Sequence, residues 1–331
     1  LVDVDGEARF GDSEGDLRAA LRIHDPRMYR MVALGGSLGA ADAFLRGYWA
    51  CDDLVAVMRI LARQRTVMTV LDKTADVVLR PYRFLKHWLR RNTRSGSRRN
   101  IAAHYDLSNE FFALMLDRTM TYSSALFESP DASLEQASLA KYDRICRKLR
   151  LRSSDHVLEI GCGWGGFAAY AAREYGCRVT ATTVSRQQFD FARERLHREG
   201  LSDRVELLLQ DYRDLRGCYD KLVSIEMIEA VGERYLDVFF AQCNRLTKPD
   251  GAMALQAITI PDHRYDRYRR SVDFIQRYVF PGGFLPSISA IGKSLHRGTD
   301  FRLDHLEDFG LHYAETLRIW RENFWANIQQ V

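Results

Sequence analysis

A glycine-rich loop constrains this chain more than any other feature of its sequence. Residues 157–167 have the sequence VLEIGCGWGGF, in which a short apolar run leads directly into closely spaced glycines. Glycine lets the backbone turn sharply and approach a ligand closely, so a strand, a glycine loop and a helix in this order typically cradle a nucleotide-like ligand. We therefore expect a nucleotide-type site where this strand ends.

Strand-like and helix-like sequences alternate around this loop. We predict strands at 157–160, 178–183, 205–209, 222–225, 252–260 and 301–306, and helices at 167–175, 186–198, 235–246 and 311–328. Such alternation favours a parallel sheet with helices on both faces. The predicted fold class is therefore α/β, with a Rossmann-like parallel sheet and a small, α-rich domain before it.

The chain is long enough for more than one core. It has 331 residues, of which 46% are apolar, and this predicts about two domains. Residues 1–79 form the predicted leading domain, with a strand pair near its start, a helical pattern that the glycines at 35–39 break, and a helix after Asp53. Residues 105–331 form the second domain, with an aromatic and basic insertion at about 261–298.

Residues 80–104 form a basic linker between these domains. They contain eight Arg or Lys residues, no acid, and interleaved aromatic side chains. Three interpretations stay open: a solvated linker, a contact with an anionic membrane surface, or a contact with nucleic acid. No Asn/Asp-Pro-Pro-Tyr-like motif of base-methylating enzymes is found, so nucleic acid is not a predicted partner.

Cysteine and hydropathy patterns bear on location. The six cysteines form no CxxC pair, which favours a reducing compartment. No run of about 18 apolar residues is present, and none has the form of a signal peptide. We predict a cytoplasmic protein that associates peripherally with the membrane. His104 and His312 lack metal-ligand spacing, so no metal site is predicted.

Two observations separate the candidate ligands of the glycine loop. A dinucleotide fold usually has an acid about 20 residues further on, whereas residues 180–184 are TATTV. Glu159 instead lies inside the strand, directly before the glycines, where it suits a ligand with an amino group and a sulfonium. S-adenosylmethionine is such a ligand. Asp211, after the third strand, is expected to accept a hydrogen bond from the adenine amine.

Several further stretches resemble the cyclopropane-fatty-acyl-phospholipid synthase family, which includes the mycolic acid methyltransferases. They are HYDLSNEFF at 104–112, MTYSSA at 120–125, the glycine loop, LQDYRD at 209–214, SIEMIEAVG at 224–232, FPGG at 280–283 and HYAETL at 312–317. The leading domain also resembles the lipid-facing domain of the full-length bacterial synthases. The resemblance implies that the sheet is of the class I S-adenosylmethionine-dependent methyltransferase type. This resemblance implies transfer of the donor's methyl group to the double bond of an acyl chain in an unsaturated membrane phospholipid, followed by proton loss and ring closure.

The resemblance also implies which residues bind the donor. With Glu159 and Asp211 from the argument above, the predicted donor-binding set is Tyr122, Ser123, Glu159, Gly161, Cys162, Gly163, Gly165, Gly166, Thr183, Ser185, Gln188, Gln210, Asp211 and Tyr212. A homodimer is kept open, because the sequence does not determine the oligomeric state.

A bound bicarbonate takes the proton in the reaction that the resemblance implies. The family holds it with a Cys, a Glu, a His, the main-chain amide of an Ile and a Tyr. Glu229, Ile258 and Tyr313 match three of these positions, whereas Ser124 and Gln256 replace the Cys and the His. Ser and Gln still donate hydrogen bonds to an anion.

Glu226 is a further departure, because many relatives have a small residue there, and Ala230 replaces a usual His. Two carboxylates three residues apart raise one another's pKa if they converge, so Glu226 or Glu229 is an alternative base to bicarbonate. The altered pocket also leaves open a methyl-branched or methylene-branched product. A non-catalytic lipid-binding protein is the alternative from another class.

The basic linker provides a test of the membrane interpretation. Replacing Arg90, Arg91, Arg98 and Arg99 with serine is expected to weaken binding to anionic vesicles, because these cations attract the headgroups. The loss should be largest at low salt, where charges are least screened. Vesicle co-sedimentation across a salt series measures this effect, with neutral vesicles as the control. Equal binding by both proteins would favour a plain linker.

Overall fold

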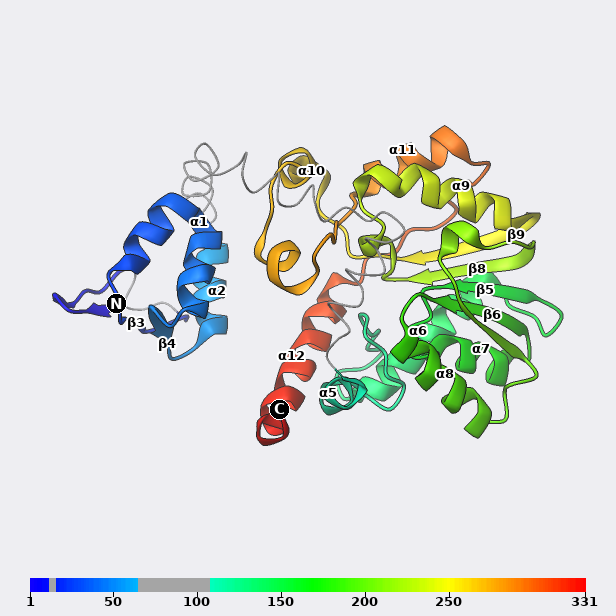
Figure 1. Cartoon of the computed structure of the whole chain (residues 1–331), viewed down its shortest axis with the longest axis horizontal. Helices are drawn as coiled ribbons and strands as arrows, with labels where there is room; N and C mark the ends of the chain where they lie inside the picture. The colour runs from blue at the N-terminus through cyan, green and yellow to red at the C-terminus, as the bar shows by residue number, and fades with distance from the viewer. Residues whose placement is uncertain (12–15, 65–107) are drawn as a thin grey trace. The chain divides into compact units, whose positions relative to one another are not determined.

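The computed structural model describes residues 1–11, 16–64 and 108–331, which form two compact units (Figure 1). The first unit contains the described N-terminal residues together with 267–279, and the second contains 108–266 and 280–331. Part of the predicted insertion therefore groups with the first unit. The predicted basic linker at 80–104 lies outside the described residues.

The first unit combines a small sheet with two helices. Its strands are β1 (Val2–Asp3), β2 (Gly6–Glu7), β3 (Leu21–Ile23) and β4 (Trp49–Cys51), in the order β2-β1-β3-β4. The helices are α1 (Arg27–Leu45) and α2 (Leu54–Arg63). The predicted N-terminal strand pair is confirmed by the antiparallel pairing of β1 with β2.

The break predicted at the glycines of α1 is confirmed. Gly36 has non-helical dihedral angles, with φ of 60° and ψ of −143°, so α1 consists of two helical segments joined by a kink. A Cβ atom at Gly39 would lie 1.9 Å from the carbonyl oxygen of Met31, so the turns beyond the kink pack too closely for any side chain there. The start of α2 is as predicted, since the Asp53 carboxylate accepts a hydrogen bond from the Ala56 N–H.

The second unit is built on a five-stranded parallel sheet. Its strands are β5 (His156–Ile160), β6 (Arg178–Thr183), β7 (Val205–Leu209), β8 (Tyr219–Ile225) and β9 (Thr247–Gln256), in the order β7-β6-β5-β8-β9. The strand order reverses between β5 and β8. In open α/β sheets, ligands bind at the carboxyl ends of the strands beside such a reversal.

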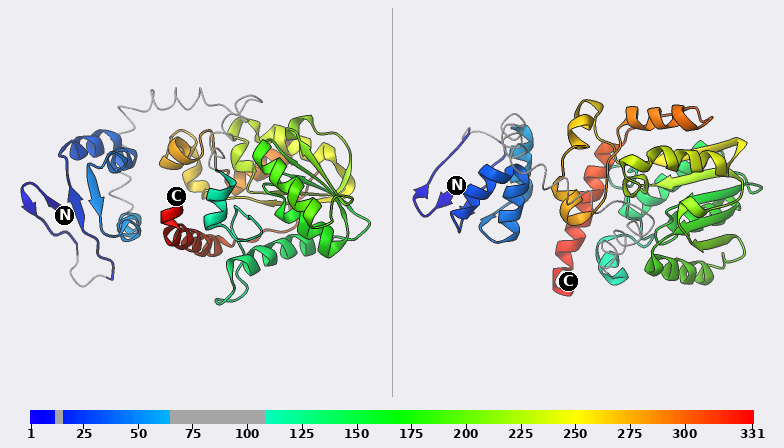
Figure 2. Two further views of the ribbon diagram at one scale, coloured as in Figure 1. Left: turned by 60° about the horizontal axis from the view of Figure 1, so that its bottom comes forward. Right: turned by 45° about the horizontal axis from the view of Figure 1, so that its top comes forward.

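Helices cover both faces of this sheet (Figures 1 and 2). One face carries α6 (Leu134–Leu149), α7 (Gly166–Tyr175) and α8 (Arg186–Arg198), and the other carries α9 (Leu236–Leu246) and α11 (Ile288–Gly298). Neighbouring strand residues serve the two faces in turn: Val157 packs in the cluster with α6 and α7, and Leu158 in the cluster with α9. The predicted α/β fold with a parallel sheet is thereby confirmed.

Further helical elements complete the second unit. They include α5 (Asn109–Met115), η1 (Tyr212–Asp214), η2 (Ile228–Ala230), η3 (Glu233–Tyr235), α12 (Gly310–Ala326) and η5 (Ile328–Gln330), while α10 (Asp262–Tyr268) continues into the first unit and η4 (Ile275–Val279) belongs to it. Helix α12 packs beside α5, where the Asn323 side chain donates a hydrogen bond to the Met115 carbonyl oxygen at 3.0 Å.

The strand predicted at 301–306 is wrong. This segment is irregular, and β9 is the edge of the sheet within the described residues. Phe301 packs against the α9 cluster, whereas the Leu303 and Leu306 side chains are 65% and 59% exposed. Phe301 therefore anchors this segment through its ring, and the alternation of apolar residues does not indicate a paired strand here. Strand β9 also ends at Gln256, four residues before the predicted end at 260.

The described helices were also assessed as membrane spans. None of them within 1–11, 16–64 and 108–331 combines the length and the apolar character needed to cross a bilayer.

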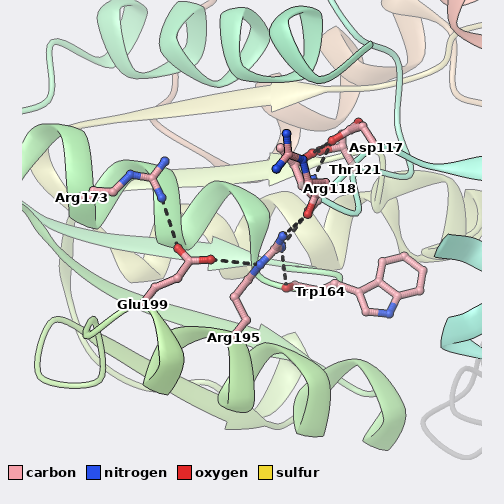
Figure 3. Close-up of polar contacts among 8 residues, drawn as sticks. Asp117, Arg118, Thr121, Trp164, Arg173, Arg195 and Glu199 are labelled. Atoms are coloured by element: carbon pink, nitrogen blue, oxygen red, sulfur yellow. Dashed lines mark hydrogen bonds and ion pairs between the residues drawn. The ribbon is translucent and has the colours of Figure 1, made fainter. Parts of the chain in front are cut away.

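Arg195 connects α8 to the segments that surround the glycine loop (Figure 3). Its buried guanidinium donates hydrogen bonds to the carbonyl oxygens of Arg118, of Thr119 at 2.7 Å and of Trp164 at 3.2 Å. Glu199 lies 3.4 Å from the Arg195 Nε atom and completes the charge balance. One side chain thus fixes the backbone on two sides of the loop.

Replacing Arg195 with methionine is expected to lower the free energy of unfolding by about 3 kcal/mol, because three carbonyl oxygens lose a donor and Glu199 loses a buried partner. Urea unfolding followed by tryptophan fluorescence measures the change. The control is Arg193→Met on the same helix, whose side chain is 63% exposed. Equal unfolding midpoints for the two variants would contradict the structural role of Arg195.

Candidate active site

A pocket opens at the carboxyl ends of the central strands, beside the reversal of strand order. Twelve of the fourteen predicted donor-binding residues line it: Tyr122, Ser123, Glu159, Gly161, Cys162, Gly163, Gly166, Thr183, Gln188, Gln210, Asp211 and Tyr212. Gly165 and Ser185 do not line it. They are the N-cap residues of α7 and α8. They shape the pocket by starting the two helices.

The glycine loop leaves room for a ligand for two different reasons. At Gly163 the backbone has φ of 52°, and no atom lies within 4 Å of where a Cβ atom would be. At Gly166 a Cβ atom would lie 2.6 Å from the Tyr142 hydroxyl oxygen and 2.9 Å from the Thr119 carbonyl oxygen. The first position keeps the pocket open, and the second lets α7 begin against its neighbours.

Glu159 supplies an unsatisfied acceptor in this pocket. It is 2% exposed, and its Oε2 atom has no hydrogen-bond partner among the described residues. Burial raises the pKa of Glu159 to about 8, and Lys141 acts in the opposite direction. Such an acceptor fits the amino group of S-adenosylmethionine, because a bound cation restores the carboxylate and satisfies its oxygen.

Asp211 lies at the far side of the pocket, after β7. Its carboxylate accepts hydrogen bonds from the Arg213 Nε atom at 2.8 Å and Nη2 atom at 2.7 Å. This ion pair orients Asp211, the residue predicted to accept from an adenine amine. Nearby, the Thr183 hydroxyl donates to the Gln188 Oε1 atom at 2.8 Å, and this contact fixes the side-chain amide at the start of α8.

Glu226 connects the donor pocket to a second group of polar residues. It lines the pocket, and its Oε1 atom accepts hydrogen bonds from the Ser124 main-chain N–H at 2.9 Å and from the Gln256 side-chain amide at 2.8 Å. The Ser124 hydroxyl donates to the Ala125 carbonyl oxygen instead. Ser124 thus contributes its backbone, rather than its side chain, to the carboxylate.

Glu229 lies on η2 in the same group. Its Oε1 atom accepts the Ile258 N–H at 2.5 Å, and its buried Oε2 atom has no partner among the described residues. Burial, and next the neighbouring Glu226, raise the pKa of Glu229 to about 8. Burial raises the pKa of the Tyr313 hydroxyl, with Glu226 and Glu229 adding to the effect. Glu226, Glu229, Ser124, Gln256, Ile258 and Tyr313 therefore form one cluster.

Helix α12 is held against this cluster by hydrogen bonds to the segment after Ser124. The Thr316 hydroxyl accepts the Ala125 N–H at 3.1 Å, and the His312 Nδ1 atom accepts the Phe127 N–H at 3.2 Å. Because Tyr313 lies between these two residues in sequence, the same bonds position it. Side chains of α12 thus contact backbone N–H groups next to the site, and the sequence pattern does not reveal these contacts.

The comparisons with known proteins agree with this geometry. Residues 92–331 match the model of a family described as mycolic acid cyclopropane synthetase. The chain is 40% identical to the tuberculostearic acid methyltransferase UfaA1 of Mycobacterium tuberculosis, over 98% of this chain and 77% of that protein. It is 37% identical to the cyclopropane-fatty-acyl-phospholipid synthase of Escherichia coli K12, over 94% and 78% of the two chains.

A solved structure is also similar. The mycolic acid cyclopropane synthase CmaA1, in complex with SAH and CTAB, matches with a TM-score of 0.66 and 33% identity, over 70% of this chain and 85% of that one. This chain belongs to the mycolic acid cyclopropane synthetase family. It is an S-adenosylmethionine-dependent methyltransferase of the cyclopropane synthase type.

Lys141 also lies in this active site, although it is not among the residues predicted from the sequence. It lies on α6, is 2% exposed, and its Nζ atom donates to the Ser123 hydroxyl oxygen at 2.5 Å. Burial lowers the pKa of Lys141 to about 8, against the opposing effect of Glu226 and other carboxylates. A lysine in an amphipathic helix is expected to be exposed, and the one available signal is its place among apolar positions of α6.

Replacing Glu159 with glutamine is expected to weaken binding of S-adenosylmethionine by roughly 10-fold to 100-fold, because a charge-assisted hydrogen bond becomes a neutral one. Isothermal titration calorimetry measures the dissociation constant. Glu174→Gln is the control, since Glu174 lies on the surface of α7 in an ion pair with Arg173. Wild-type affinity in the Glu159→Gln protein would exclude this carboxylate from donor binding.

Proposed function

We propose that this chain methylates the double bond of an unsaturated acyl chain in a membrane phospholipid and closes a cyclopropane ring. The observation that carries the proposal is the buried carboxylate cluster beside the donor pocket. Addition of a methyl group to an alkene leaves a carbocation that must lose a proton from carbon, and this loss calls for a base inside an apolar site.

The reaction proceeds in two steps. S-adenosylmethionine supplies an electrophilic methyl group. The π electrons of the alkene form a bond to this methyl carbon while the carbon–sulfur bond breaks, which leaves the positive charge on the second alkene carbon. A base then removes a proton from the methyl group, and the electrons of that C–H bond close the ring. The alkene is a poor nucleophile, so alignment with the donor supplies much of the rate.

Aromatic residues support the carbocation step. The ring of Tyr122 lies 5.2 Å from that of Phe112 and 5.1 Å from that of Trp320. Tyr122 also lines the donor pocket. Aromatic faces stabilise a cation without capturing it, and a dry pocket prevents water from adding to it.

The insertion supports an acyl substrate. Phe280 belongs to it, and its ring lies 6.5 Å from that of Tyr122. Tyr265 and Phe284 form an edge-to-face pair at 5.7 Å in the same insertion. Phe280 thus places an aromatic ring beside Tyr122 at the donor pocket, which suits an apolar acyl chain. A phospholipid is the favoured carrier, because the related Escherichia coli enzyme is named for one.

A branched acyl chain is the second candidate product. The 40% identical relative is named a tuberculostearic acid methyltransferase. The cluster also departs from the family pattern at Ser124, Gln256, Ala230 and Glu226. A ring and a methylene branch need the same donor pocket and the same first step. The branch requires a hydride to move from the methylated carbon to the cationic carbon before the methyl group loses its proton, whereas the ring closes without that shift.

Product analysis tests both candidates. The purified chain is incubated with S-adenosylmethionine carrying a deuterated methyl group and with vesicles of mono-unsaturated phosphatidylglycerol. We expect phospholipid that has gained the label, with two deuterium atoms retained and no ozone-cleavable double bond. Mass spectrometry before and after ozonolysis measures both. A labelled chain that ozone still cleaves would establish methylene branching, and an unlabelled lipid would contradict acyl methylation.

A further inference from the structure

The anion position implied by the family resemblance is already filled in this chain. The Ser124 N–H and the Gln256 side-chain amide both donate to Glu226, and the Ile258 N–H donates to Glu229. Three of the five family positions therefore direct their donors at carboxylates of the chain itself. Bicarbonate does not fit these residues, since it would have to displace the carboxylates from their donors.

Repulsion between like charges also disfavours bicarbonate at this position. Glu226, Glu229 and Glu159 are buried carboxyl groups, and Lys141 is the buried cation that acts on Glu159 and Glu226. Placing a further anion against Glu226 and Glu229 would add repulsion between like charges at low dielectric. A neutral small residue in place of Glu226 would remove this obstacle and leave the donors of Ser124 and Gln256 available to an external anion.

We propose that Glu226 is the base that removes the proton from the transferred methyl group, and that this reaction needs no bicarbonate. The inference rests on the proposed function. Glu226 belongs to the cluster and also lines the donor pocket, so it is the carboxyl group through which the cluster meets that pocket. Glu229 is held by Ile258 and does not line this pocket.

The backbone at Glu226 is shaped for this role. Its φ is 47°, a left-handed conformation that costs a residue with a side chain about 1 kcal/mol or more. The Glu226 N–H donates to the Gln256 carbonyl oxygen at 2.8 Å, while the Gln256 side chain donates back to the Glu226 carboxylate. This reciprocal pair holds the strained turn and aims the carboxylate at the end of β8.

The hydrogen bonds around Glu226 favour its ionised form. Its Oε1 atom accepts two hydrogen bonds, from the Ser124 N–H and the Gln256 side-chain amide, whereas Glu229 accepts the Ile258 N–H and its Oε2 atom has no partner among the described residues. Burial raises the pKa of Glu226, while Lys141 and these two hydrogen bonds act in the opposite direction. Hydrogen bonds to a carboxylate favour its charged form, so Glu226 is the better placed of the two carboxyl groups to act as a base.

The proton balance of the step is complete. Glu226 begins as a carboxylate and ends as a carboxylic acid, the carbocation becomes a neutral cyclopropane, and the donor leaves as a neutral thioether. Opening of the site to water returns the proton to solvent. No oxidant, reductant or second anion takes part.

Bicarbonate dependence is the direct test. Methyl transfer to phospholipid vesicles is measured in buffer purged of carbon dioxide, with and without added millimolar bicarbonate. The wild-type chain is expected to show the same turnover in both. Asp237→Asn on α9, away from the cluster, is the matched carboxylate control and should behave as the wild type does. Wild-type turnover that disappears without bicarbonate would overturn the inference.

Two substitutions of Glu226 make the test specific. Glu226→Gln keeps the volume and removes the base, so turnover should fall about 100-fold or more, whether or not bicarbonate is present. Glu226→Ala frees the donors of Ser124 and Gln256, so bicarbonate should restore part of its activity. A thermal shift on adding S-adenosylhomocysteine confirms that each variant is folded and keeps its donor pocket.

The outcomes separate this inference from the proposed function. Bicarbonate-dependent turnover in the wild type, or near-wild-type turnover in Glu226→Gln, leaves acyl methylation intact and overturns the role of Glu226. Failure of Glu226→Ala to respond to bicarbonate would overturn the assignment of the anion position. A wild-type chain that methylates no acyl lipid overturns the proposed function, and this inference with it.

Discussion

Burial of like charges around one ammonium group is the interaction on which the active site depends. Glu159, Glu226 and Glu229 are withdrawn from water at the carboxyl ends of the parallel strands, and Lys141 is the cation that acts on the first two of them. A buried carboxylate is costly unless it is hydrogen-bonded or paired. The sheet reduces this cost, because β5, β8 and β9 bring hydrogen-bond donors from several loops to one edge.

The reversal of strand order explains why these groups converge. Strand β5 carries Glu159, β8 leads into Glu226, and β9 ends at Gln256, where Ile225 and Gln256 are register partners. Ser124 and Ile258 lie in irregular segments near this edge, where their backbone N–H groups donate to the carboxylates instead of to a helix or strand partner. The strand order therefore brings the carboxyl groups and their hydrogen-bond donors together, and individual side chains then set how these groups interact.

The strands and the donor pocket were largely predictable from the sequence, because buried parallel strands have continuous apolar runs and the glycine loop has a strong local signature. The prediction fails where the decisive contact is not local. Residues 301–306 lack a strand partner in the described chain, and Lys141 is buried near carboxylates that come from distant parts of the chain.

The contacts of Ser124 show a further limit of sequence comparison. Replacement of a cysteine by serine suggests a weaker donor in the same role, yet the structure assigns the carboxylate contact to the Ser124 backbone and turns the hydroxyl to Ala125. The change at position 124 is therefore coupled to Glu226, which requires that N–H, and to Gln256, which is long enough to reach the same oxygen. In the reaction proposed for this chain, the positive charge passes from sulfur to carbon and leaves as a proton. A carboxylate that belongs to the protein accepts that proton without an external anion having to enter a site that already holds like charges.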